Sequence, residues 1–175
     1  MSKYLINEEY AVEEAGAAKA YGRGERREDY ADPWKETGNV ILLGLPGSGR
    51  RELARLLAER TGKSAIVPED AQAAAEALRG SGAVIVLEDR LVDAPEVGPL
   101  IHSAGKVFYL MADTHLLSKR VAERDGIADA DELWRGLSAR LAEVEPVFYS
   151  VLHFILQGAE QPQDLLDDAM EKIGY

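Results

Sequence analysis

The chain has no cysteine, which excludes disulfide bonds, thiolate catalysis and cysteine-ligated metal. It has no apolar run near the roughly 20 residues of a membrane span, and its N-terminus turns acidic before the apolar core of a secretory signal can form. Positive charge is in deficit, since 20 Lys and Arg against 31 Asp and Glu give a formal net charge of −11. Such a charge attracts neither nucleic acid nor an anionic membrane face. We therefore expect no nucleic-acid or membrane partner and, by elimination, a cytoplasmic location.

The remaining composition is ordinary for a globular protein. The 175 residues are 46% hydrophobic and 29% charged, which allows one domain with a single sizeable core. We divide the chain into a partly helical N-terminal arm, residues 1–37, and a main domain, residues 38–175. The arm is interpreted either as a solvated appendage or as a segment that docks, on this chain or on a protein partner, through Tyr30 and Trp34.

From residue 39 onward, strand and helix patterns alternate. Strands are predicted at 39–44, 64–67, 83–87, 106–111 and 152–156. Helices are predicted at 50–61, 69–79, 95–103, 113–125, 131–149 and 162–173. Strands that alternate with helices of about 10 to 15 residues predict an α/β fold of three layers, in which helices cover both faces of a parallel sheet.

The most distinctive segment is residues 39–51, NVILLGLPGSGRR. An apolar strand pattern leads through closely spaced glycines into a helical pattern, which is the context that the phosphate-binding motif G-x-x-x-x-G-K-[ST] requires. Such glycines let successive backbone N–H groups surround an anion, and the helix N-terminus adds its positive end. The residues predicted to bind a nucleotide or a phosphate anion are Gly44, Leu45, Pro46, Gly47, Ser48, Gly49, Arg50 and Arg51.

The two chemical residues of that motif are replaced. Arg50 stands where the motif has Lys, and it can still neutralise phosphate, although its planar fork does not reproduce a compact ammonium. Arg51 stands where the motif has Ser or Thr, and a guanidinium cannot ligate Mg²⁺ and repels it. Phosphoryl transfer depends on metal and cation placement, so the loop predicts anion binding with impaired catalysis.

Two acidic residues, Glu88 and Asp89, close the predicted strand 83–87. A carboxylate at such a position assists the Mg²⁺ shell in P-loop enzymes, so these are the residues that would hold a divalent ion if one binds. The alternative is an internal salt bridge, in which a guanidinium of Arg50 or Arg51 takes the place of the ion.

The loop and its surroundings resemble a known family. Residues 40–49, VILLGLPGSG, followed by residues 53–62, LARLLAERTG, resemble the opening of shikimate kinases, in the nucleoside-monophosphate-kinase branch of P-loop proteins. The resemblance continues through residues 106–113, KVFYLMAD, and resumes at residues 145–149, EPVFY. It covers about residues 39–173 and implies a five-stranded parallel sheet with the P-loop strand in the centre.

By position, the resemblance assigns roles to three further residues. Asp70 matches the substrate-binding Asp and joins Arg50 as a catalytic candidate; the alternative is a helix residue favoured by the helix dipole. Arg120 matches the adenine-stacking Arg, and the alternative is a solvent-facing side chain. Arg124 is the remaining cation of a lid that is arginine-rich in the family and acidic here, at residues 125–131.

Other substrate-site features of the family are missing. Residues 87–89, Leu-Glu-Asp, replace a triple glycine that helps to hold shikimate. Val144 replaces a substrate-binding Arg, and the alanine-rich residues 71–82 replace a longer segment with an essential Arg. The chain therefore departs from the family most strongly on the side where the phosphoryl acceptor would bind.

These observations leave three hypotheses. The first is a shikimate kinase-like protein that binds nucleotide or phosphate weakly, has lost most or all kinase activity and serves as a scaffold or regulatory partner. The second is an active ATP-dependent small-molecule kinase with an altered metal shell. The third is a structural interaction module whose loop is closed by Arg–carboxylate pairs. ATP or ADP is the expected ligand of the first two, and Mg²⁺ binding is expected only for the second.

Overall fold

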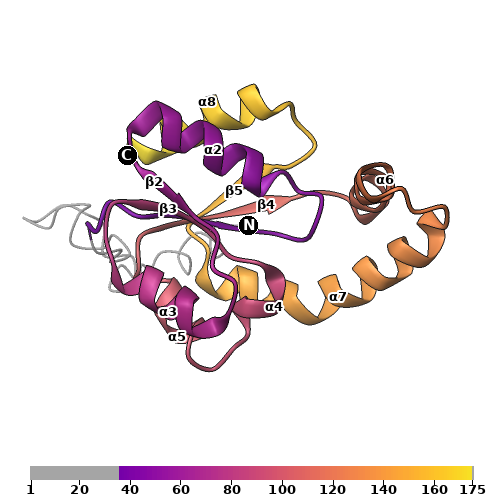
Figure 1. The fold of residues 1–175 in the computed structure, drawn as a ribbon, viewed down its shortest axis with the longest axis horizontal. Helices are drawn as coiled ribbons and strands as arrows, with labels where there is room; N and C mark the ends of the chain where they lie inside the picture. The colour runs from indigo at the N-terminus through magenta and orange to yellow at the C-terminus, as the bar shows by residue number, and fades with distance from the viewer. Residues whose placement is uncertain (1–35, 175) are drawn as a thin grey trace, which may run out of the picture. The chain divides into compact units, whose positions relative to one another are not determined.

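The computed structural model describes residues 36–174, and the expectations for the N-terminal arm lie outside this part except at its last two residues. Five parallel strands form one sheet in the order β2-β3-β1-β4-β5 (Figure 1). The strands are β1 (Val40–Leu43), β2 (Ser64–Ile66), β3 (Ala83–Val86), β4 (Lys106–Met111) and β5 (Phe154–Gln157). The predicted five-stranded parallel sheet with the loop-bearing strand in its centre is therefore confirmed.

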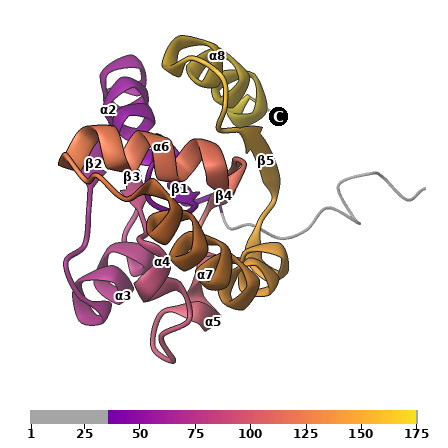
Figure 2. The same cartoon turned by 90° about the vertical axis from the view of Figure 1, so that its right-hand side faces the viewer.

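Helices cover both faces of this sheet and complete the three predicted layers (Figures 1 and 2). They are α2 (Arg50–Thr61), α3 (Ala71–Arg79), α4 (Asp89–Val92), α5 (Gly98–Ile101), α6 (Thr114–Asp125), α7 (Ala130–Val151) and α8 (Pro162–Ile173). Side chains alternate across a strand, so β1 sends Val40 and Leu42 to the core beneath α2 and α8. Ile41 and Leu43 enter the opposite core, with residues of α3, α4, α5 and α7. No helix in residues 36–174 is both long and apolar enough to cross a membrane.

The segment after β3 differs from the predicted pattern. One helix is predicted at 95–103, whereas the structure has only the shorter α5 within that range, and α4, which was not predicted, precedes it. Pro95 precedes α5 and Pro99 lies in its first turn, where the missing N–H group of proline is tolerated, so the helix begins later than predicted. The consequence for the site is that Glu88 and Asp89 occupy the N-cap and first position of α4, directly after β3.

A buried asparagine ties together the end of the sheet opposite the glycine loop. Asn39 is 2% exposed, and its Nδ2 donates to the carbonyl oxygens of Gly80 at 2.9 Å and Ala104 at 3.1 Å. Its Oδ1 accepts from the N–H of Ala83 at 3.0 Å. Because one side chain joins the starts of β1, β3 and β4, it fixes the strands whose other ends carry the site.

The helices α6 and α7 form a hairpin that reaches past the sheet on the side of the glycine loop (Figure 1). His115 of α6 stacks on Trp134 of α7, with ring centroids 4.5 Å apart. The Thr114 and Ser138 hydroxyls join the two helices by a hydrogen bond of 3.0 Å. The hairpin therefore places α6 beside the loop and lets α7 run back to the sheet.

Candidate functional site: a P-loop pocket lined by paired charges

The loop between β1 and α2 has the backbone that its glycines predict. Gly44, Gly47 and Gly49 have φ angles of 155°, 87° and 88°, in the region that favours glycine. A Cβ on Gly44 would lie 2.8 Å from Ser48 Oγ, and a Cβ on Gly47 would lie 3.0 Å from the Leu117 carbonyl oxygen. A Cβ on Gly49 would meet nothing within 4 Å. The first two glycines therefore allow close packing, while the third faces open space at the start of α2.

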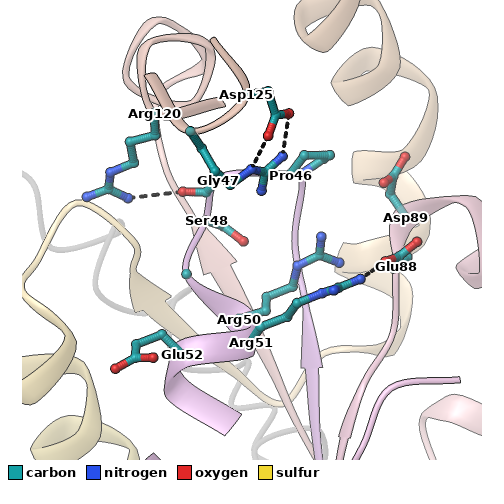
Figure 3. A pocket seen from close by; sticks show the side chains of 12 residues that line it. Pro46, Gly47, Ser48, Arg50, Arg51, Glu52, Glu88, Asp89, Arg120 and Asp125 are labelled. Carbon is teal, nitrogen blue, oxygen red and sulfur yellow. Dashed lines mark hydrogen bonds and ion pairs between the residues drawn. The ribbon is translucent and has the colours of Figure 1, made fainter. Parts of the chain in front are cut away.

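A pocket of about 590 Å³ lies against this loop (Figure 3). It is lined by Pro46, Gly47, Ser48, Gly49, Arg50, Arg51, Glu52, Glu88, Asp89, Arg120, Arg124 and Asp125. The N-terminus of α2 has no side-chain cap, so its first N–H groups remain available to an anion. The structure thus gathers the whole predicted loop except Gly44 and Leu45 around one pocket, together with Glu88, Asp89, Arg120 and Arg124.

Arg50 turns inward beneath the loop. The side chain is 8% exposed, and its Nη1 donates to the Leu87 carbonyl oxygen at 2.5 Å. Burial lowers the pKa of Arg50 to about 10, while the nearby carboxylates of Asp89 and Glu88 oppose that shift. Arg50 is therefore a cation at neutral pH, with one nitrogen anchored to the end of β3.

Arg51 points to the same end of β3 and pairs with Glu88 (Figure 3). Its Nη2 lies 2.5 Å from Glu88 Oε1, and Arg90 Nε lies 3.0 Å from the other oxygen of that carboxylate. Burial raises the pKa of Glu88, but the hydrogen bonds from Arg51 and Arg90 outweigh it and leave the pKa below its ordinary value. This is the geometry that the salt-bridge interpretation of Glu88 requires.

Asp89 has a partner that sequence reasoning missed. Arg140 of α7 places its Nε 2.8 Å from Asp89 Oδ2 and its Nη2 2.7 Å from the Asp89 carbonyl oxygen. The same guanidinium reaches Asp93 Oδ2 at 3.3 Å. The two residues of the closest contact are 51 positions apart, so no local spacing pointed to Arg140.

Arg120 does not extend into solvent as the alternative interpretation expected. It is half-buried, and its Nη1 donates to the carbonyl oxygens of Gly47 at 3.2 Å and Gly158 at 2.7 Å. A second pocket, of about 290 Å³, shares Gly47, Ser48, Gly49 and Arg120 with the first and continues to the segment between β5 and α8. Arg120 therefore joins α6, the loop and the β5–α8 connection.

Arg124 is exposed and is held by its neighbour in the chain. Its Nε and Nη2 lie 2.7 and 2.9 Å from the two carboxylate oxygens of Asp125. The hydrogen bond to Asp125, opposed by slight burial, raises the pKa of Arg124. Arg124 lines the pocket, but Asp125 neutralises the cation that the family resemblance assigned to a lid.

Asp70 lies apart from the pocket. It is exposed and caps α3 from the position before the first turn, where its Oδ1 accepts from the N–H of Ala73 at 2.8 Å. It is not among the residues that line the pocket at the glycine loop. The geometry therefore gives Asp70 a capping contact and does not bring it to Arg50, the other catalytic candidate.

The pocket as a whole is balanced in charge. Four arginines and four carboxylates line it, so its formal charges cancel. Within residues 36–174, no three His, Asp or Glu side chains gather as a metal would need. Ser48 Oγ is buried and has no hydrogen-bond partner in this part of the chain, so a donor or acceptor is left over at the loop.

Together, the parallel sheet, the glycine loop on its central strand and the helix that follows define an α/β P-loop kinase fold. The chain has a shikimate kinase-like P-loop fold, as the comparisons with solved structures show. Shikimate kinase from Acinetobacter baumannii, in complex with shikimate, superposes with a TM-score of 0.68 at 17% identity, over 77% of this chain and 92% of that one. Shikimate kinase from Bacteroides thetaiotaomicron gives a TM-score of 0.68 at 15% identity, over 78% and 98%.

The same fold occurs in proteins with other ligands. The YorR protein from Bacillus subtilis, in complex with phosphorylated GDP, gives a TM-score of 0.63 at 14% identity, over 78% of this chain and 95% of that one. No protein-family model and no curated protein sequence matches the chain. The comparisons therefore establish the fold, and the chemistry has to come from the residues of the pocket.

Proposed function

We propose that this protein binds phosphate, either free or as part of a nucleotide such as ATP or ADP, in the P-loop pocket without efficient phosphoryl transfer. The observation that carries the proposal is the 2.5 Å contact between Arg51 and Glu88. It puts an ion pair where a P-loop kinase needs a hydroxyl and a metal ion. Anion binding is supported by the uncapped N-terminus of α2 and by the positive charge of Arg50.

The fold family implies a Mg²⁺ ion beside the nucleotide, and the residues present do not fit it. Arg51 has no oxygen to offer, and its positive charge opposes a divalent ion at that position. Glu88 already accepts from Arg51 and Arg90, and Asp89 accepts from Arg140. A metal would have to displace Arg51 and Arg90 to gain Glu88, and Arg140 to gain Asp89.

A binding site without turnover suits a scaffold or regulatory protein. In that role, a protein partner would bind differently to the protein with an occupied loop and to the protein with an empty loop. The pocket supports such a use because Arg120 and the α6–α7 hairpin contact the loop directly, so an anion there changes contacts on a second element.

A structural module with a permanently closed loop is the second candidate. The observation in its favour is the balance of four arginines and four carboxylates, which leaves little net attraction for an anion. An active kinase is the third candidate, and it requires Mg²⁺-dependent binding and transfer.

Isothermal titration calorimetry with ATP, ADP and inorganic phosphate, each in EDTA and in Mg²⁺, separates these candidates. The proposal predicts binding of at least one ligand with the same affinity in both buffers. Absence of binding in every condition supports the structural module, and binding that requires Mg²⁺ supports the kinase.

A double substitution, Arg50→Lys with Arg51→Ser, tests the same site from the opposite direction. It restores an ammonium and a hydroxyl, so we expect the affinity for Mg²⁺–ADP to rise above that for ADP alone. Arg60→Ser, at the exposed far end of α2, removes a similar charge outside the pocket and serves as the control. Unchanged Mg²⁺ dependence in the double variant would count against the proposed role of Arg51.

A further inference from the structure

Asp89 is bound by a residue of α7, a helix that is distant from the P-loop in the sequence. It lies at the start of α4 and lines the pocket, and Figure 3 shows it at the pocket margin, apart from Arg50 and Arg51. Arg140 of α7 grips it at two points, the carboxylate at 2.8 Å and the carbonyl oxygen at 2.7 Å. A two-point contact fixes both the side chain and the backbone of Asp89.

This contact is more enclosed than the Arg51–Glu88 pair. The side chains of Arg140 and Asp89 are 26% and 15% exposed, whereas those of Arg51 and Glu88 are 70% and 25% exposed. Shielding from water strengthens a charged hydrogen bond, so Arg140 holds Asp89 more firmly than Arg51 holds Glu88. Asp93 at 3.3 Å and Glu143 at 3.4 Å surround the same guanidinium with further negative charge.

The two acidic groups at the end of β3 are therefore unequal. Glu88 can lose one of its two cations to an incoming phosphate, because Arg51 is exposed and can turn to the anion, while Arg90 stays on the other carboxylate oxygen. Asp89 stays engaged whether or not Arg51 moves, since Arg140 belongs to another element. An anion that enters the loop thus meets one carboxylate, Glu88, that can lose a cation to it, and one, Asp89, that stays paired with Arg140.

We propose that Arg140 is a positioning residue that keeps the carboxylate of Asp89, which lines the phosphate pocket, engaged in an ion pair, so that the loop takes phosphate esters free of divalent metal. The inference rests on the proposed function. It adds a second reason why a divalent metal does not bind, namely the contact between Arg140 and Asp89. Restoring Lys and Ser in the loop removes only half of the obstacle to a metal ion, because Asp89 still has Arg140 as its partner.

The test measures Mn²⁺ bound in the presence of ADP by electron paramagnetic resonance, so that no turnover is required. Arg140→Gln frees Asp89, and we expect Mn²⁺ affinity in the presence of ADP to rise by about tenfold, the lower end of the range by which changes in the partners of metal ligands alter metal affinity. Arg135→Gln is the matched control, since Arg135 is exposed on the same helix. Adding Asp89→Asn to Arg140→Gln should return the affinity to that of the unmodified protein.

Two results would overturn the inference: an unchanged Mn²⁺ affinity in Arg140→Gln, or a raised affinity that persists when Asp89→Asn is added. If Arg140→Gln fails to fold because Asp89 loses this partner, Arg140→Lys replaces it. Lysine cannot make the two-point contact, so we expect the Mn²⁺ affinity in the presence of ADP to rise by roughly twofold to threefold. An unchanged Mn²⁺ affinity in this variant would also overturn the inference. Failure of the proposed function is a separate result, because it appears as no ADP binding to the unmodified protein in EDTA.

Discussion

Replacing Glu88 by Gln should tighten the binding of ADP in the absence of metal. The substitution removes the partner of Arg51 and leaves that guanidinium, already 70% exposed, free to turn to a phosphate. It also removes one negative charge from the lining of the pocket. Both effects act in the same direction if the ligand is an anion and no metal takes part.

The size of the effect follows from Coulomb's law. For a carboxylate at about 6 Å from a phosphate charge, the repulsion is roughly 0.7 kcal/mol in bulk water and roughly 2.8 kcal/mol at the dielectric of a protein surface. The pocket is open enough to leave Arg51 mostly exposed, so we take a value near the lower end. About 1 kcal/mol corresponds to binding that is roughly fivefold tighter.

The assay is calorimetric titration of ADP in EDTA at low salt, because salt screens such charges over about 10 Å. Glu59→Gln is the control, since Glu59 also pairs with an arginine of α2, Arg55 at 2.5 Å, but does not line the pocket. We expect ADP affinity to be unchanged in Glu59→Gln. Equal or weaker binding of ADP in Glu88→Gln would refute the reasoning, and weaker binding in Mg²⁺ would identify Glu88 as a metal ligand.

Three further predictions concern the scaffold of the site and its charge. Asn39→Ala leaves the buried N–H of Ala83 without its acceptor and should lower the free energy of unfolding in urea by about 1–3 kcal/mol; a loss below about 1 kcal/mol would contradict the role of Asn39. Gly47→Ala should lower the melting temperature more than Gly49→Ala, because both pay roughly 1–2 kcal/mol for positive φ but only the first meets a carbonyl oxygen at 3.0 Å. Phosphate binding should weaken as pH rises through about 10, where Arg50 loses its proton, while the cost of burying that cation disappears over the same range; pH-independent binding up to pH 11 would contradict the part given to Arg50.

The positions of the strands along the chain and the loop were predictable because both depend on local signals, whereas the central place of the loop-bearing strand came from the family resemblance. Near-continuous apolar runs identify strands that are buried on both faces, and β1 has all four residues buried. The glycine spacing at Gly44 and Gly49 identifies the loop, since few other sequences place that turn between a strand and a helix. Around Pro95 and Pro99, periodicity alone predicted a helix longer than α5 and missed α4.

The partners of the site residues were harder to predict because they are set by tertiary contacts. Arg120 had two interpretations, an adenine-stacking residue and a solvent-facing side chain, and neither predicted its hydrogen bonds to the carbonyl oxygens of Gly47 and Gly158. The sequence correctly placed Asp70 near the start of a helix, where its carboxylate accepts from the N–H of Ala73. Nothing in the sequence indicated that Asp70 lies outside the residues that line the pocket. Arg140 carried no signal at all, because its contact with Asp89 depends on how α7 packs on α4.

The central claim is that a guanidinium–carboxylate pair stands in place of the metal ion of a P-loop kinase. A crystal structure of the protein with ADP and MnCl₂, with the anomalous signal of manganese recorded, tests it most directly. We predict phosphate oxygens at the N-terminus of α2, Arg140 still bound to Asp89, and no anomalous peak in the pocket. An ordered Mn²⁺ between the ADP phosphates and Glu88 or Asp89, with Arg51 turned away, would contradict the account.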